Sequence, residues 1–233
     1  MVTDLDRARR RRRLKRALDS ITFNLTITWT PRSPDELATP WTVTAYLDDF
    51  EALDEGTSAY EPDPIFWMNG WLFPVLPHGI TMAYALDAVD ADTEVFVPLT
   101  DSAGELAGEY QNGTGSHLVA VDKVRLERQW RGMGGLGIYL AGSAFLLLSD
   151  YAICIALHPK PFELLEGREE RDLSQEEYAR ATKKLTRLWS TLSAEPAPGK
   201  NLVIGPSLIG LCNAVDGLHA RLSGSKQPLE RSR

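Results

Sequence analysis

Glycines are concentrated in one short stretch of the sequence, residues 131–137, where the chain has RGMGGLG. Successive glycines let a bound group approach the backbone closely and adopt positive φ without strain. An apolar stretch at 138–148 predicts that a helix follows, and a helix N-terminus attracts anions through its exposed N–H groups and its dipole. Arg131 either adds a positive charge to this anion site or is a solvated surface arginine. The pattern predicts a site for a pyrophosphate.

The same stretch satisfies the GxGxxG pattern of Rossmann dinucleotide-binding proteins. That fold needs the glycines directly after a strand, and an acidic residue about 20 residues further on that holds the ribose. Here residues 127–131 separate the strand from the glycines, and the next strand ends in ALH at 156–158. A nicotinamide-dependent dehydrogenase is therefore the less favoured alternative.

Three side chains near this stretch could transfer protons. His158 ends a short apolar stretch, and histidine titrates near neutral pH, which suits a general base. Glu127 ends the preceding strand, and Tyr151 begins the later one. Each also has a structural alternative: a strand-end histidine bonded to backbone, an exposed carboxylate and a packing tyrosine.

The cysteines and tryptophans favour core positions. Cys154 and Cys212 lie in apolar surroundings and have no Cys or His spacing typical of zinc sites, so we expect buried thiols and no metal. Aromatic residues on strands are core residues first, although they could also line an acceptor pocket. The tryptophans concerned are Trp29, Trp41, Trp67 and Trp71.

The N-terminal half predicts strands. Apolar and polar residues alternate over 21–29 and 41–47, the pattern of strands with one buried face. A short connection separates them, so we expect antiparallel neighbours. The aromatic stretch 65–76 predicts a bent or paired strand, the acidic stretch 48–63 a loop and 78–89 a helix.

The C-terminal half alternates strands with helices. Ser174 and Glu177 predict a capping box for a helix that extends to about residue 192. Apolar residues at helical spacing predict an amphipathic C-terminal helix over 208–222, and 200–204 predicts a short strand. A βαβ unit is predicted by the strand, turn, helix and strand at 118–126, 131–137, 138–148 and 151–157.

Residues 121–149 (VDKVRLERQWRGMGGLGIYLAGSAFLLLS) resemble motif A of the GCN5-related N-acetyltransferase (GNAT) superfamily. In that motif a strand and a short link precede R/Q-x-x-G-x-G/A, which opens a helix. RGMG at 131–134 matches the first half and LG at 136–137 matches the end, with Gly135 inserted. HPKPF at 158–162 and KLTRLWSTLSAEP at 184–196 are similar to later parts of the family, so the resemblance covers about residues 118–205.

The resemblance implies a mixed α/β (α+β) fold with a mostly antiparallel central sheet flanked by helices. Its fourth and fifth strands would splay apart around acetyl-CoA, with the pyrophosphate on the glycine turn and no metal. The implied reaction is direct attack of an amine on the thioester, with His158, Glu127 and Tyr151 as candidate catalytic residues. Carried over, the cofactor-binding residues are Val124, Arg125, Leu126, Arg131, Gly132, Met133, Gly134, Gly135, Leu136 and Gly137.

Two departures from the family leave catalysis open. The family's frequent tyrosine acid, which protonates the departing thiolate, falls at Trp189, and an indole cannot serve as that acid. The family's L-G-F ending is LSA at 192–194. We expect an N-acetyltransferase that acts on a small-molecule or peptide amine. The alternative is a catalytically inactive protein of the same fold that binds CoA or a macromolecule.

The composition is that of one ordinary globular chain. Its 233 residues are 43% apolar and 24% charged, enough for a full core. Residues 1–16 carry a net charge of +6 and the remainder −13, which together give −7. The Arg-rich arm could contact nucleic acid, but sixteen residues cannot supply a groove-reading fold, so a solvated arm is favoured. The acidic body would steer a cationic acceptor toward the protein.

No signal-type apolar segment follows the N-terminal charges, so we expect a cytoplasmic protein. Residues 133–157 are apolar, but glycines crowd one end and Asp150 would lie inside the bilayer, so no membrane span is expected. The C-terminal helix could cover its own core or a partner's, which leaves a homodimer open. The expected units are a basic arm at 1–19, an acyl-CoA N-acyltransferase-like domain at 20–206, the amphipathic helix at 207–223 and a polar tail at 224–233.

Overall fold

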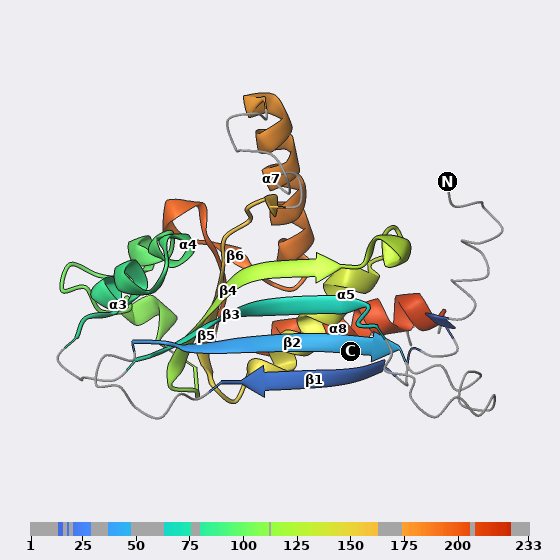
Figure 1. Cartoon of the computed structure of the whole chain (residues 1–233), viewed down its shortest axis with the longest axis horizontal. Helices are drawn as coiled ribbons and strands as arrows, with labels where there is room; N and C mark the ends of the chain where they lie inside the picture. The colour runs from blue at the N-terminus through green and yellow to red at the C-terminus, as the bar shows by residue number, and fades with distance from the viewer. Residues whose placement is uncertain are drawn as a thin grey trace, which may run out of the picture.

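The computed structural model describes residues 14–15, 18, 21–28, 37–47, 63–75, 80–111, 113–162, 174–205 and 208–224. Seven strands in this part of the chain form one open sheet in the order β1-β2-β3-β4-β5-β7-β6 (Figure 1). Their bounds are β1 Ile21–Ile27, β2 Thr39–Leu47, β3 Phe66–Pro74, β4 His117–Leu126, β5 Ala152–Leu157, β6 Glu195–Pro196 and β7 Leu202–Ile204.

Neighbouring strands of the sheet are antiparallel except β4 and β5, which run parallel. The expected α+β class with a mostly antiparallel sheet is confirmed. The Rossmann alternative needs a mostly parallel sheet, which the described residues do not form. The expected pairing of the first two strands is also confirmed, with Ile21 opposite Leu47 and Ile27 opposite Trp41.

The helices follow the expected positions closely. The α-helices are α3 Met82–Val89, α4 Ala91–Glu94, α5 Leu136–Leu148, α7 Gln175–Ser190 and α8 Leu208–Ser223, and the 3-10 helices are η2 Val97–Leu99, η3 Gly108–Tyr110, η4 Arg128–Trp130 and η6 Pro198–Lys200. The capping box at the start of α7 is confirmed. Ser174 Oγ accepts a hydrogen bond from the Glu177 amide at 3.2 Å, and Glu177 Oε2 accepts one from the Ser174 amide at 3.3 Å.

Two apolar cores lie on opposite faces of the sheet, because side chains alternate along each strand. Val119 and Val121 of β4 face the core that α5 and α8 cover. Leu118 and Ala120 face the second core, which α3 and the residues around η2 cover. Figure 1 shows α5 and α8 side by side behind the sheet. β5 is apolar throughout because it is buried on both faces.

The C-terminal helix α8 covers the chain's own core. Leu211, Val215 and Leu218 are buried against α5 and the sheet. The sequence left open whether the apolar side chains over 208–222 cover the chain's own core or a partner's. Packing within the chain accounts for them. Helices long and apolar enough to cross a membrane do not occur among the residues that the structure describes.

Some expectations were wrong or lie outside the described residues. Cys154 is buried, and burial raises its pKa to about 12, but Cys212 is exposed, contrary to expectation. Trp41 is a core residue, while Trp67 and Trp71 are half-buried. Trp29, most of the acidic stretch at 48–63, most of the basic arm and the tail after residue 224 lie outside the described residues.

Candidate functional site

β4 and β5 are hydrogen-bonded along only the first half of β4. Their pairing extends from His117 opposite Ala152 to Val121 opposite Leu157, whereas β4 itself continues to Leu126. The last five residues of β4 therefore have no partner in β5, and four of them, Lys123 to Leu126, pair with β3. This geometry leaves space between the carboxyl ends of two parallel strands.

A β-bulge marks the point where β4 leaves β5. Asp122 is the extra residue of the bulge, because the register with β3 shifts between Asn69 and Gly70. Gly70 is needed there, since a Cβ at this position would collide with the carbonyl oxygen of Ala120. Bulges bend a strand and re-aim its side chains. Here the bulge turns a carboxylate toward the space beside β5.

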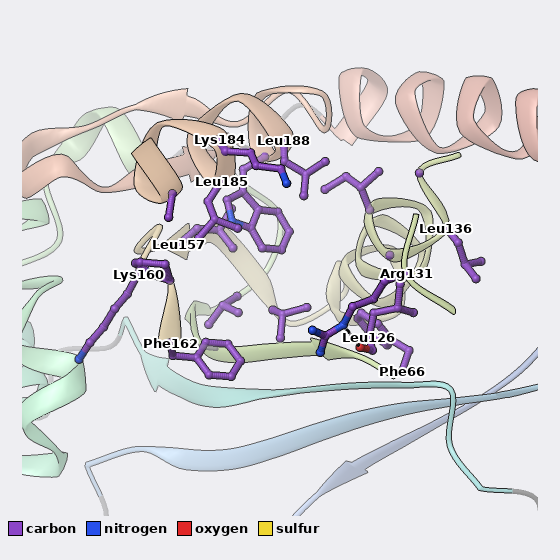
Figure 2. A pocket seen from close by; sticks show the side chains of 18 of the residues that line it. Phe66, Leu126, Arg131, Leu136, Leu157, Lys160, Phe162, Lys184, Leu185 and Leu188 are labelled. Atoms are coloured by element: carbon purple, nitrogen blue, oxygen red, sulfur yellow. Dashed lines mark hydrogen bonds between the residues drawn. The ribbon is translucent and has the colours of Figure 1, made fainter. Parts of the chain in front are cut away.

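A cavity of about 470 Å³ fills that space, which is within the range of about 300–1,000 Å³ usual for small-molecule sites. Figure 2 shows Lys184, Leu185 and Leu188 of α7 on one side of it, with Phe162 and Leu126 on the other. The lining residues are Phe66 of β3; Val121, Asp122, Val124 and Leu126 of β4; Arg131, Gly132, Met133 and Gly135 of the turn; Leu136, Gly137 and Ile138 of α5; Leu157, His158, Lys160, Pro161 and Phe162 of β5 and its exit; and Ala181, Lys184, Leu185, Leu188 and Trp189 of α7.

The glycine turn forms one wall of this cavity, and its backbone conformation favours glycine. Gly132, Gly134 and Gly135 have φ values of +73°, +64° and +102°. Gly135 is the N-cap of α5, whose N-terminus has no side-chain cap. A Cβ on Gly132 would meet nothing within 4 Å, so the backbone there is open to a bound group. The turn thus offers backbone N–H groups and a helix dipole to the cavity.

The presence of glycine at the inserted position, Gly135, has a physical explanation of its own. Besides its positive φ, a Cβ there would lie 2.5 Å from Nη2 of Arg221 and 3.4 Å from Cδ2 of Leu218, both on α8. α8 therefore packs directly behind the turn, and the φ of +102° favours glycine at this position more than the contact with the flexible end of Arg221 does.

Basic side chains outnumber acidic ones on the cavity wall, although the whole chain has a net charge of −7. Arg131, Lys160 and Lys184 line the cavity, and Asp122 is the acidic residue among its described lining residues. Arg131 Nε donates a hydrogen bond to the Leu126 carbonyl at 2.9 Å, which holds its guanidinium beside the end of β4. The cavity can therefore attract an anion within an acidic protein.

Most of the expected cofactor-binding residues lie on this cavity, and two do not. Arg125 lies off the wall, and its Nε is 3.6 Å from Oε1 of Glu127. Gly134 also lies off the wall, since a Cβ there would point to Leu222 of α8. Those on the wall are Val124, Leu126, Arg131, Gly132, Met133, Gly135, Leu136 and Gly137.

The three expected catalytic residues are separated by the fold. His158 lies on the cavity wall, where β5 ends. Glu127 directly follows β4 and its side chain does not line the cavity. Tyr151 lies at the opposite end of β5, where its carbonyl accepts the amide of His117 at 2.9 Å. The structure therefore brings His158 to the cavity and leaves Tyr151 away from it.

A second cavity of about 200 Å³ meets the first along a shared wall. Its far side includes Asp92 and Phe96, and Asp92 Oδ1 is 3.0 Å from Nζ of Lys160. Figure 2 shows the Lys160 side chain leading away from the larger cavity. The residues that line both cavities are Val121, Asp122, His158, Lys160 and Phe162.

Asp122 is the site residue that the sequence did not reveal. Burial raises its pKa, and the nearby carboxylates of Asp92 and Asp90 raise it further, while the ammonium group of Lys123, 3.1 Å away, lowers it. In the sequence, the available signal was a charged pair, Asp122 and Lys123, that interrupts the apolar strand expected at 118–126. That signal alone does not distinguish a bulge from an exposed strand face.

Trp189 also lines the larger cavity, where a titratable group would have been useful. Its ring lies 6.0 Å from that of Phe145, tilted by 41°, and its side chain is buried. An indole neither gives up nor takes a proton at neutral pH, so His158 and Asp122 are the candidate acid–base groups on this wall.

A scan against protein-family models finds no match for this chain, and a search of the curated proteins finds none either. The arrangement itself suits an elongated anionic ligand whose phosphates contact the glycine turn. Such a ligand could lie along the unpaired end of β4 and place its reactive end at the wall shared with the second cavity. A smaller molecule in the second cavity would meet it beside His158 and Asp122.

Proposed function

We propose that this protein is an acyl-CoA-dependent N-acyltransferase with a GNAT-like fold, which transfers an acetyl group from acetyl-CoA to an amine. The observation that carries the proposal is the cavity of about 470 Å³ between the unpaired end of β4 and β5, with the glycine turn on its wall. In the GNAT family the splayed fourth and fifth strands hold CoA in this position, as the sequence resemblance implies.

The chemistry of the wall supports CoA as the ligand. Beyond Val121, β5 no longer pairs with the edge of β4 that borders the cavity, so the amides of a pantetheine arm can form hydrogen bonds to that edge. The open backbone at Gly132 and the N-terminus of α5 suit a pyrophosphate. Arg131 and Lys184 add positive charge along the same cavity. Apolar residues such as Leu126 and Leu185 suit the pantetheine methylene groups.

The two cavities separate the reactants on this proposal. Acetyl-CoA occupies the larger cavity and the amine enters the smaller one, so that the thioester and the amine meet at their shared wall. The amine nitrogen bonds to the thioester carbonyl carbon, the C–S bond breaks and the thiolate leaves. His158 accepts the proton that the amine releases, and Asp122 orients the incoming nitrogen through its carboxylate.

Calorimetric titration of the protein with CoA and acetyl-CoA tests the proposal. We expect saturable binding of both ligands, because they share the phosphates and the pantetheine arm. The absence of binding at millimolar ligand would remove the proposal, together with the role of the glycine turn.

A second candidate function is a CoA-binding protein without transferase activity, and Trp189 is the observation that favours it. Its buried indole stands where the family has a tyrosine acid. Thiol release from acetyl-CoA in the presence of a primary alkylamine, an arylalkylamine, a polyamine and a peptide α-amine separates the two. Thiol release with one of these amines supports the enzyme, whereas binding without release on any of them supports the second candidate.

A further inference from the structure

Asn201 is the most deeply buried polar side chain near the shared wall, and its amide has a single consistent orientation. It is 1% exposed and follows η6, where Gly199 and Lys200 adopt φ values of +72° and +65°. Its Nδ2 donates to the carbonyl oxygens of Val95 at 2.8 Å and Pro198 at 2.9 Å. Both amide hydrogens are used, so Oδ1 is left to face the remaining neighbour.

That neighbour is His158, whose Nδ1 lies 2.9 Å from Oδ1 of Asn201. An amide oxygen can only accept a hydrogen bond, so Nδ1 of His158 must donate. Reversing the Asn201 amide would direct its NH₂ group at His158 and its oxygen at two carbonyl oxygens, which is unfavourable. The neutral imidazole is therefore the Nδ1–H tautomer, which free histidine does not favour.

We propose that Asn201 is a positioning residue that fixes this tautomer, so that His158 presents an unprotonated Nε2 to the wall shared by the two cavities. The inference rests on the proposed function for the use of that nitrogen: Nε2 takes the proton of the attacking amine. Asn201 occupies the ring edge that carries Nδ1, which leaves Nε2 as the ring nitrogen that can contact a molecule in the cavities that His158 lines.

The surroundings are consistent with a polar role for Nε2. Asp122 and Lys160 line both cavities beside His158, and Asp92 and Lys123 line the smaller one. Each carboxylate already has an ammonium partner, with Lys123 3.1 Å from Asp122 and Lys160 3.0 Å from Asp92. The carboxylates beside His158 are thus already paired with ammonium groups, which leaves Nε2 of His158 as the candidate acceptor for the proton of an amine.

Two-bond ¹H–¹⁵N correlation spectra of the uniformly ¹⁵N-labelled full chain test the inference directly. The chain has four histidines, and the signals lost in His158→Gln identify His158. At a pH where the imidazole is neutral, we expect Nδ1 to have the shift of a protonated nitrogen and Nε2 that of an unprotonated one. The opposite pattern in the wild-type protein would overturn the inference, and this spectrum requires no variant at Asn201.

Asn201→Leu keeps the branching and the number of heavy atoms of the side chain and removes its acceptor and its donor. We expect its His158 to return toward the Nε2–H tautomer. Thr93→Val is the matched control, because Thr93 is also 1% exposed and its hydroxyl also bonds backbone carbonyls, so it lowers stability without changing the tautomer. An unchanged His158 tautomer in folded Asn201→Leu would contradict a positioning role.

The same proteins connect the tautomer to the reaction. With an amine that supports thiol release, Asn201→Leu should lower kcat by about tenfold or more while the Kd of CoA stays unchanged, since a misplaced tautomer costs up to about 10⁴-fold in a histidine-dependent triad. A lower kcat in Thr93→Val of equal size would overturn this role. An Nδ1–H spectrum in a protein that binds no CoA would remove the proposed function while supporting the tautomer assignment.

Discussion

At the residue scale, Asp122 and His158 lie together on the wall that the two cavities share. Asp122 is held half-buried by a bulge, and burial raises its pKa. Ionising a carboxylate in this position lowers the stability of the folded protein. Groups with such a cost are found more often at functional sites than at purely structural positions. On the proposed function, its place beside His158 lets the pair orient and deprotonate an amine.

Gly132 offers the sharpest residue-scale test of the phosphate site. Gly132→Asp places a carboxylate on the open wall, where a Cβ meets no neighbour within 4 Å. We expect calorimetry to show CoA affinity weakened by about tenfold or more, because a like charge then faces the pyrophosphate.

Gly132→Asn is the matched control for this test. Asparagine has nearly the same shape and also tolerates the positive φ of Gly132, so it should retain most of the affinity. Equal losses in the two variants would show that backbone strain, and not charge, governs the turn.

The sequence predicted part of this site because that part is local. The glycine turn, Arg131 and the following helix are contiguous, and all belong to one cavity wall. Asp122 and Asn201 could not be predicted in the same way. The bulge at Asp122 depends on the pairing of β4 with β3, whose register shifts between Asn69 and Gly70, and Asn201 is 43 residues from His158.

At the element scale, α5 and α8 pack closely enough to require glycine between them. A Cβ on Gly142 of α5 would lie 2.6 Å from Cγ2 of Val215 and 2.9 Å from Cδ2 of Leu192. Valine is stiff at χ1, so Val215 cannot easily move away. This contact fixes α5, and with it the glycine turn at its N-terminus.

Gly142→Ala should therefore destabilise the protein despite the better helix propensity of alanine, which alone would gain about 1 kcal/mol. Overpacking costs about 1–3 kcal/mol, so we expect a lower free energy of unfolding in denaturant titrations. The cost should shrink in a Val215→Ala background, since the clashing methyl group is gone. Equal costs in both backgrounds would contradict close packing between α5 and α8.

The predicted elements agree with the structure where periodicity or capping was strong, as in β1, α7 and α8, and α5 was predicted from its continuous apolar stretch. Short elements such as α4 and β6 were not predicted. A helix of four residues and a strand of two carry too little periodicity to be recognised in a sequence. Parallel pairing of β4 and β5 followed from the βαβ order. The residue at which this pairing ends could not be predicted, because it is set by the bulge and not by the composition of either strand.

At the scale of the whole molecule, the proposed site and His117 lie at opposite ends of the sheet. The cavities lie at the carboxyl ends of β4 and β5, while His117 and Tyr151 lie at the other end, where the two strands begin. His117 lines neither cavity. His117→Gln is therefore a matched control for His158→Gln, and only the latter should lower thiol release.

His117 should also make the stability of the whole molecule depend on pH. Burial lowers its pKa below the ordinary value of 6.5, so the unfolded chain binds a proton that the folded chain resists. Stability is then full above pH 6.5 and falls as the pH drops below it. Thermal unfolding from pH 7 to 5 should show a steeper loss for the wild-type protein than for His117→Gln. Parallel losses would contradict this role for His117.

A crystal structure of the protein with CoA would locate the ligand and so test whether the cavity between β4 and β5 is the CoA site. We predict the pyrophosphate on the turn at 131–137, the pantetheine arm along β4 between Val124 and Leu126, and the sulfur at the wall that contains Asp122 and His158. CoA bound at another surface, or crystals grown in millimolar CoA that contain none, would contradict the account.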